Sequence, residues 1–82
     1  MKKMTIYVVG GKWYYKTLDK AIEKAKEYII DFNTDYYNVK NDWEIKTHKS
    51  GKYTVQVTIE SLYRKTCPSV ATCTIRPIET ED

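Results

Sequence analysis

The sequence predicts an α+β domain in which one helix packs on an antiparallel sheet, in the order ββαβββ. Two short β-branched and aromatic runs flank a Gly-Gly pair, an amphipathic run follows at helical spacing, and three further strand-like runs come after it. With 82 residues, the chain is expected to form a single domain over 1–82, with a short acidic tail at about 79–82. Its content of 41% hydrophobic and 30% charged residues is typical of globular rather than disordered chains.

The first two strands are predicted at residues 5–9 and 12–16, because each run is rich in β-branched and aromatic residues. Only two glycines lie between them, which favours a two-residue hairpin of type I′ or II′. In that register Tyr7 lies opposite Tyr14 on the outward face. The inward face is then expected to carry Ile6, Val8, Trp13 and Tyr15.

A helix is predicted directly after this hairpin. Thr17 is a suitable N-cap, Asp19 lies in the first turn, and Asn33 can close the C-terminal end. The apolar residues at helical spacing are Leu18, Ala21, Ile22, Ala25, Tyr28, Ile29 and Phe32. They occupy one arc of the helix, which must therefore pack on a sheet.

Residues 33–42 are interpreted as a connection, and two alternating strands follow it. A two-residue turn between these strands would mix their polar and apolar faces, whereas a three-residue loop 49–51 places Ile45 opposite Val55. We therefore expect Gly51 to be left-handed in that loop.

The last strand is expected to contain Cys73 as a small core residue and to end at a sheet edge near Pro77, which has no N–H to donate. Cys67 and Cys73 are separated by five residues. This spacing is longer than metal-binding knuckles use, and the single histidine does not complete a ligand set, so no metal or cofactor is expected. Free thiols and a disulfide closing this small loop remain the two alternatives.

Catalytic side chains are few. His48 lies beside a predicted turn and is expected to be solvated, and the sequence shows no pattern that joins it to a cysteine nucleophile. Gly10, Gly11 and Lys12 lack the spacing and the following helix of a phosphate-binding loop. The chain is therefore expected not to be an enzyme.

Two groups of residues are candidates for binding. The outward hairpin face would combine Tyr7 and Tyr14 with Lys12 and Lys16, an arrangement on which single-stranded nucleic acid can stack. The second group occupies predicted connections and consists of Tyr36, Tyr37, Tyr63 and Arg64. Tyrosine and arginine are enriched at protein interfaces, although the same rings can also close the ends of a small core.

The formal charge of +3 is mild for a nucleic-acid-binding domain. No run of about 18 apolar residues is present, and the apolar segment after the first lysines is too short for a signal peptide. A cytoplasmic protein is therefore expected.

The segment "GKWYYKTLDKAIEKAKEYI" resembles the strand-then-helix unit of small bacteriophage-encoded accessory proteins. The resemblance implies a host-takeover or anti-defence inhibitor in a bacterial or phage-infected cell. Such a protein is a non-enzymatic protein-binding module that masks a surface of a host enzyme or defence complex. Single-stranded nucleic-acid binding is the alternative function, and a homodimer that covers the open sheet face would also account for the tyrosines.

Overall fold

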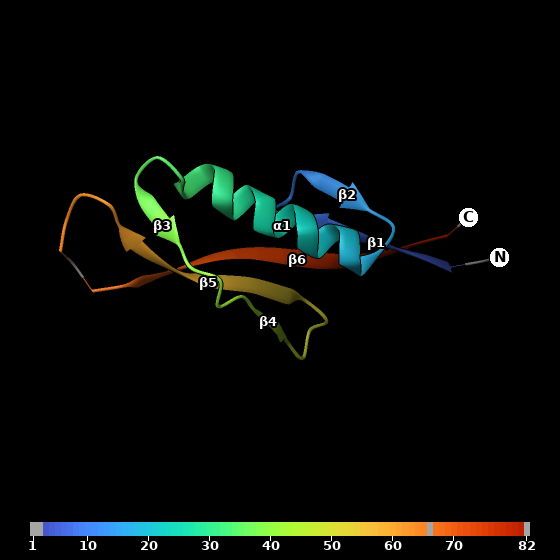
Figure 1. Cartoon of the computed structure of the whole chain (residues 1–82). Coiled ribbons are helices and arrows are strands. Elements are labelled where there is room, and N and C mark those ends of the chain that lie inside the picture. Colours follow the sequence, from blue (N-terminus) through green and yellow to red (C-terminus); the bar gives the residue numbers. More distant parts are fainter. Residues whose placement is uncertain (1–2, 66, 82) are drawn as a thin grey trace.

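The computed structural model describes residues 3–65 and 67–81, in which one helix packs on one antiparallel sheet (Figure 1). The elements are β1 (Lys3–Val9), β2 (Trp13–Tyr15), α1 (Leu18–Asn33), β3 (Tyr37–Val39), β4 (Glu44–Thr47), β5 (Tyr53–Ser61) and β6 (Ser69–Glu81). The strand order is β2-β1-β6-β5-β3, and β4 pairs with β5 beside β3. The predicted α+β class is confirmed, with six strands in the described residues instead of five.

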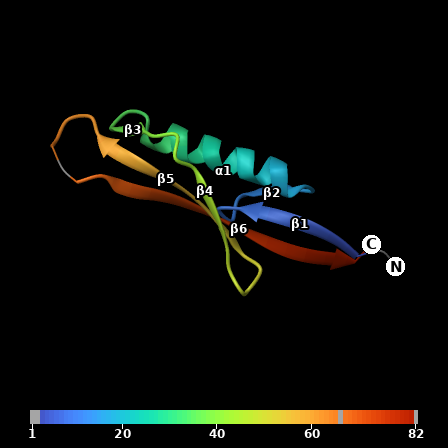
Figure 2. The same ribbon diagram turned by 60° about the horizontal axis from the view of Figure 1, so that its bottom comes forward.

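The long strand β6 is the centre of the sheet. It pairs with β5 through residues 69–75 and with β1 through residues 75–81, so that Ile75 lies opposite both Val9 and Tyr53. β1 and β5 therefore each pair with about half of β6, and they do so on opposite sides of it. The result is an elongated, twisted molecule (Figure 2), with extents of 55 × 24 × 17 Å along its principal axes.

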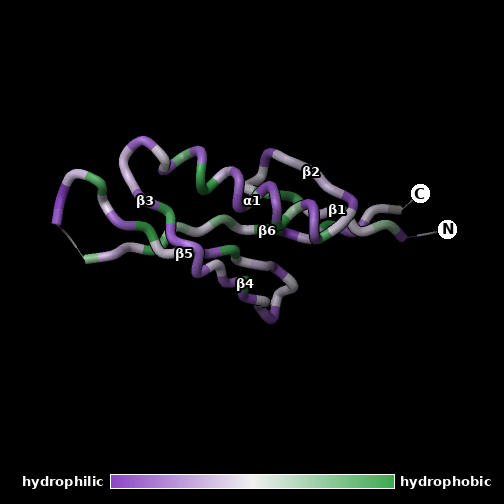
Figure 3. The backbone as a smooth tube through the Cα atoms, in the orientation of Figure 1, coloured by the Kyte–Doolittle hydropathy of each residue, from purple (hydrophilic) through white to green (hydrophobic). Residues whose placement is uncertain are grey.

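The core lies between the buried side of α1 and one face of the sheet. It consists of Val9, Ala21, Ala25, Ile29, Val55, Val57, Ile59, Cys73 and Ile75. Along the backbone, apolar segments recur in the helix and central strands, whereas the turn between β4 and β5 is hydrophilic (Figure 3). Alanines at two of the helix positions let α1 approach the sheet closely.

Both predicted ends of the helix are confirmed. Thr17 is extended (φ −121°, ψ 147°), and its hydroxyl accepts a hydrogen bond from the Lys20 N–H at 3.3 Å. Asn33 is the last helical residue, and its buried side-chain amide donates to the Ile29 carbonyl at 2.8 Å. One residue that was predicted on the buried face of the helix is exposed, since Phe32 is 73% accessible to solvent.

The predicted register of the first hairpin is wrong by one residue. Its loop contains Gly10, Gly11 and Lys12, and Trp13 lies opposite Val9. The Lys12 N–H donates to the Val9 carbonyl at 3.0 Å, and both glycines have positive φ (58° and 74°). The glycines do form the turn, but Lys12 belongs to the loop and not to the strand.

This change of register inverts the faces of β1. Tyr7 and Val9 face the helix, as Trp13 and Tyr15 do on β2, whereas Ile6 and Val8 lie on the other face. Residues 5–9 are apolar at nearly every position, so alternation does not decide which side is buried. Pairing with β6, which places Val9 beside buried Ile75, decides it.

The second hairpin is confirmed. Ile45 lies opposite Val55, the Gly51 N–H donates to the His48 carbonyl at 2.9 Å, and Gly51 has φ 91°. The interpretation of residues 33–42 as a connection is wrong at β3, whose three residues pair with the far end of β5 through Ile59–Ser61. β4 is too short to pair with all nine residues of β5, so a second strand covers the remainder.

The expectation for Pro77 is confirmed in part. β6 is central rather than an edge strand, and Pro77 lies opposite Tyr7 of β1. However, the pairing of β5 stops at Ile75, so the other side of β6 is open from there on. Pro77 is therefore beside a local edge within a central strand.

Candidate functional site

The predicted platform of Tyr7 and Tyr14 does not form. Tyr7 is half-buried on the helix face, where its ring centroid lies 6.4 Å from that of Tyr53. Tyr14 lies opposite Val8 on the other face and is 66% exposed. Lys12 and Lys16 are exposed beside the hairpin, but they do not frame a pair of tyrosines. The one-residue change of register separates the two rings.

The other predicted group is brought together. Tyr36 and Tyr37 lie at the start of β3, Tyr63 and Arg64 follow β5, and these four residues and Ser61 line one open hollow of about 490 Å³. Tyr36 is 64% and Tyr63 is 75% exposed. Tyr36 and Tyr63 therefore do not close the end of the core, whereas Tyr37 is half-buried and packs against it, as the alternative interpretation expected.

Hydrogen bonds between the two connections hold this hollow. The Leu62 N–H donates to the Tyr36 carbonyl at 3.0 Å, and the Tyr63 hydroxyl donates to the Asp35 carbonyl at 3.3 Å. The Ser61 hydroxyl accepts from the backbone N–H groups of Tyr63 (3.3 Å) and Arg64 (3.1 Å). The backbone that carries these exposed side chains is thus held in place by hydrogen bonds within the chain.

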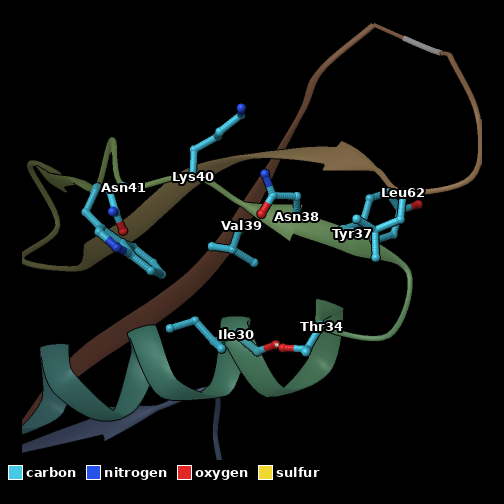
Figure 4. Close-up of a pocket in the computed structure, with 9 residues that line it drawn as sticks. Ile30, Thr34, Tyr37, Asn38, Val39, Lys40, Asn41 and Leu62 are labelled. Atoms are coloured by element: carbon cyan, nitrogen blue, oxygen red, sulfur yellow. Dashed lines mark hydrogen bonds between the residues drawn. The ribbon is translucent and has the colours of Figure 1, made fainter.

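A groove between α1 and β3 adjoins the hollow, and Tyr37 lines both. In Figure 4, Ile30 of the helix and Val39 of β3 point toward one another across this groove. Its volume is about 340 Å³, and Trp43 and Leu62 add further apolar surface to its lining. Ile30 is 41% and Leu62 is 53% exposed, so the groove is open to solvent.

We call this continuous region the β3 surface. Its residues are Ile30, Tyr36, Tyr37, Val39, Trp43, Leu62, Tyr63 and Arg64. The sequence analysis missed the aliphatic members of the set and Trp43. For Ile30 the sequence did contain an indication of a binding role, because it is an apolar residue outside the buried arc of the helix.

Asp42 fixes the segment that leaves the β3 surface. Its carboxylate accepts hydrogen bonds from the backbone N–H of Thr58 at 2.9 Å and from the Thr58 hydroxyl. These bonds, the hydroxyl bond first, hold the pKa of the Asp42 carboxyl below its usual range. The neighbouring Lys40 amide donates to the Thr58 carbonyl at 2.9 Å, and its side chain pairs with Glu60 at 3.2 Å.

The histidine and the cysteines do not meet. His48 shares a hydrogen bond of 2.7 Å with the Thr54 hydroxyl, on the face opposite Cys73. Cys67 follows β5 whereas His48 precedes it, so the two residues lie beyond opposite ends of a nine-residue strand that is roughly 25 to 30 Å long. The sheet therefore keeps His48 away from both thiols.

The two thiols are unlinked and differ in environment. Cys67 is exposed, whereas Cys73 is buried in the core, as the sequence analysis predicted. Burial raises the pKa of the Cys73 thiol, so this side chain stays protonated at neutral pH. Across residues 3–65 and 67–81, no group of three or more His, Cys, Asp or Glu side chains is arranged to hold a metal ion.

The fold defines a small α+β domain with one helix on an antiparallel sheet. No protein-family model, curated protein or solved structure is significantly similar to it. Within the described residues, no helix has the length and apolar character that crossing a membrane requires.

Proposed function

We propose that the chain is a non-enzymatic protein-binding module whose β3 surface covers a patch on a larger protein. We propose that the chain acts as a phage inhibitor, which masks a surface of a host enzyme or defence complex in the bacterial cytoplasm. The observation that carries the proposal is the convergence of Tyr36, Tyr63 and Arg64 on one exposed and ordered surface.

The composition of the β3 surface supports this proposal. Tyrosine, tryptophan and arginine provide most of the binding energy at protein interfaces, because they bury a large area and keep a polar group for hydrogen bonding. The groove beside Ile30 and Leu62 offers an apolar recess for a side chain of the partner. An aromatic rim beside an apolar recess suits a protein surface better than a single small ligand.

The fixed conformation of the β3 surface also supports the proposed protein-binding function. Binding is weakened when loops must lose conformational freedom on association. Here the backbone at Tyr36, Tyr63 and Arg64 already has hydrogen-bond partners within the chain. The cost of ordering these connections is therefore largely met in the free protein.

A photo-crosslinking experiment tests the proposal. A benzophenone amino acid is placed at Tyr63 of the full chain, which is expressed in bacterial cells and irradiated. We expect one defined protein to be captured in stoichiometric amount. The purified captured protein should lose its activity or its own assembly when the unmodified chain is added, and Tyr63→Ala should weaken this effect by about 10-fold or more.

Tyr14 provides a matched control. It is 66% exposed, close to the value for Tyr63, but it lies in β2, at the opposite edge of the sheet from β3, on the face away from the helix. Crosslinker at Tyr14 should give no such adduct, and Tyr14→Ala should leave inhibition unchanged. Equal capture from both positions, or capture of nucleic acid alone at Tyr63, would contradict the proposal.

A further inference from the structure

The outer edge of β3 has no partner strand. β3 is at one end of the strand order, and none of the described strands pairs with its far side. The Lys40 N–H donates to the Thr58 carbonyl of β5 at 2.9 Å. Because backbone groups alternate in direction along a strand, the N–H and C=O groups of Tyr37 and Val39 point away from β5. These groups are therefore open to another strand.

The sequence of β3 does not protect this edge. Charged side chains usually discourage an edge strand from pairing further, and β4 carries two of them, Glu44 and Lys46, both exposed. β3 has the sequence Tyr-Asn-Val, without a charge, proline or glycine. Lys40, which follows it, is already paired with Glu60 at 3.2 Å. The edge of β3 is therefore suited to accept a strand.

The groove between α1 and β3 runs along this open edge. Residues 37–41 all line it, and Val39 points across it toward Ile30 (Figure 4). In an added strand, the residues opposite Tyr37 and Val39 would have their side chains on this same face, and would enter the groove. A helix in the groove would leave the open backbone groups of β3 without protein partners. The shape and the backbone together favour an extended occupant.

A cation lies at each end of the groove. At one end, the Lys26 ammonium is 5.6 Å from the centre of the Trp43 ring. At the other end, Arg64 lines the hollow that shares Tyr37 with the groove. Within residues 3–65 and 67–81, neither Lys26 nor Arg64 forms an ion pair. Charge complementarity therefore favours an occupant with acidic side chains on both sides of its apolar residue.

We propose that the outer edge of β3 accepts an extended segment of the partner protein, in which an apolar residue is flanked by acidic residues. The segment adds a strand to the sheet through the open backbone groups of Tyr37 and Val39, and its apolar side chain enters the groove beside Ile30. Its acidic side chains meet Lys26 and Arg64. This inference rests on the proposed function, because it specifies which part of a partner the β3 surface recognises.

Selection from a displayed library of random short linear peptides on the purified full chain tests this inference. We expect the selected peptides to share an apolar position with acidic residues on both sides, at the alternate spacing of a strand. In the complex, amide hydrogen exchange at Tyr37 and Val39 should slow by at least about 10-fold. The Lys40 amide should be protected with or without peptide, through its bond to Thr58.

Two isoleucine variants form a matched pair for this experiment. Ile30→Ala removes one wall of the groove and should weaken peptide binding by about 10-fold. Ile78→Ala removes the same side chain at similar exposure, 45% against 41%, on the face of the sheet away from α1. It should leave the affinity for the peptide unchanged.

Three outcomes would overturn the inference: no peptide is selected, the selected peptides have apolar residues at helical spacing, or bound peptide leaves exchange at Tyr37 and Val39 unchanged. None of these depends on the folding of a variant. If one of them occurs while crosslinker at Tyr63 still captures a protein, the proposed function stands and strand addition is wrong. Peptide bound at the β3 edge without any protein captured at Tyr63 would retain the strand-binding edge and remove the masking function.

Discussion

Ile75 is the position at which the sheet should be most sensitive to the loss of one methylene. It is fully buried and is the one residue of β6 with a partner in both β1 and β5. Ile75→Val removes a buried methylene, a transfer contribution of about 0.8 kcal/mol. The close-packed surroundings cannot fully collapse into the space, so the total loss of unfolding free energy should be about 1 kcal/mol.

Ile78 on the same strand is the matched comparison. It lies on the outer face and is 45% exposed, so Ile78→Val loses only part of the transfer contribution and leaves no cavity. The expected loss is about 0.4 kcal/mol. For a domain of this size, the two changes should lower the Tm by about 4–8 °C and about 2–3 °C respectively.

The assay is thermal and urea unfolding, followed by far-UV circular dichroism at one fixed protein concentration, because association also shifts the Tm. The m-value should not change, so the difference appears in the urea midpoint. Equal losses for the two variants, or a larger loss for Ile78→Val, would refute the placement of Ile75 at the centre of the core.

Two further predictions concern titratable side chains. Asp42→Ala should lower the Tm at neutral pH; the folded-state pKa of Asp42 lies below its ordinary value of 3.8, so its contribution is fully present above that value and is lost as pH falls through the folded pKa. Melting curves of both proteins should therefore converge in strong acid, and a constant gap at all pH values would exclude the Thr58 hydrogen bonds as the cause. With a thiol reagent under native conditions, exposed Cys67 should react at once and buried Cys73 only on unfolding; rapid labelling of both thiols would contradict the burial of Cys73.

The helix and the second hairpin could be predicted because local chemistry and burial agree there. Thr17 begins the helix, and Gly51 allows the loop that places Ile45 opposite Val55. The first hairpin could not be predicted in register, since residues 5–9 are apolar on both faces. Only the pairing of β1 with β6, a contact between the two ends of the chain, determines which face is buried.

The β3 surface was predictable in part. Tyrosines in polar connections indicated Tyr36, Tyr37 and Tyr63, but their convergence depends on β3, which is only three residues long. The existence of β3 was indicated only indirectly. Because β5 is longer than β4, the remaining edge of β5 required another strand to pair with. The groove beside Ile30 follows from that pairing and could not be seen from the helix alone.

The central position of β6 has a consequence for how the chain folds. The strand that joins β1 to β5 follows the other described strands in the sequence, and Lys3 pairs with Glu81. Closing so long a loop has a high entropic cost, which is recovered only when β6 pairs on both sides. The sheet therefore cannot assemble before β6 is available to pair, and folding is expected to be slow for a domain of this length.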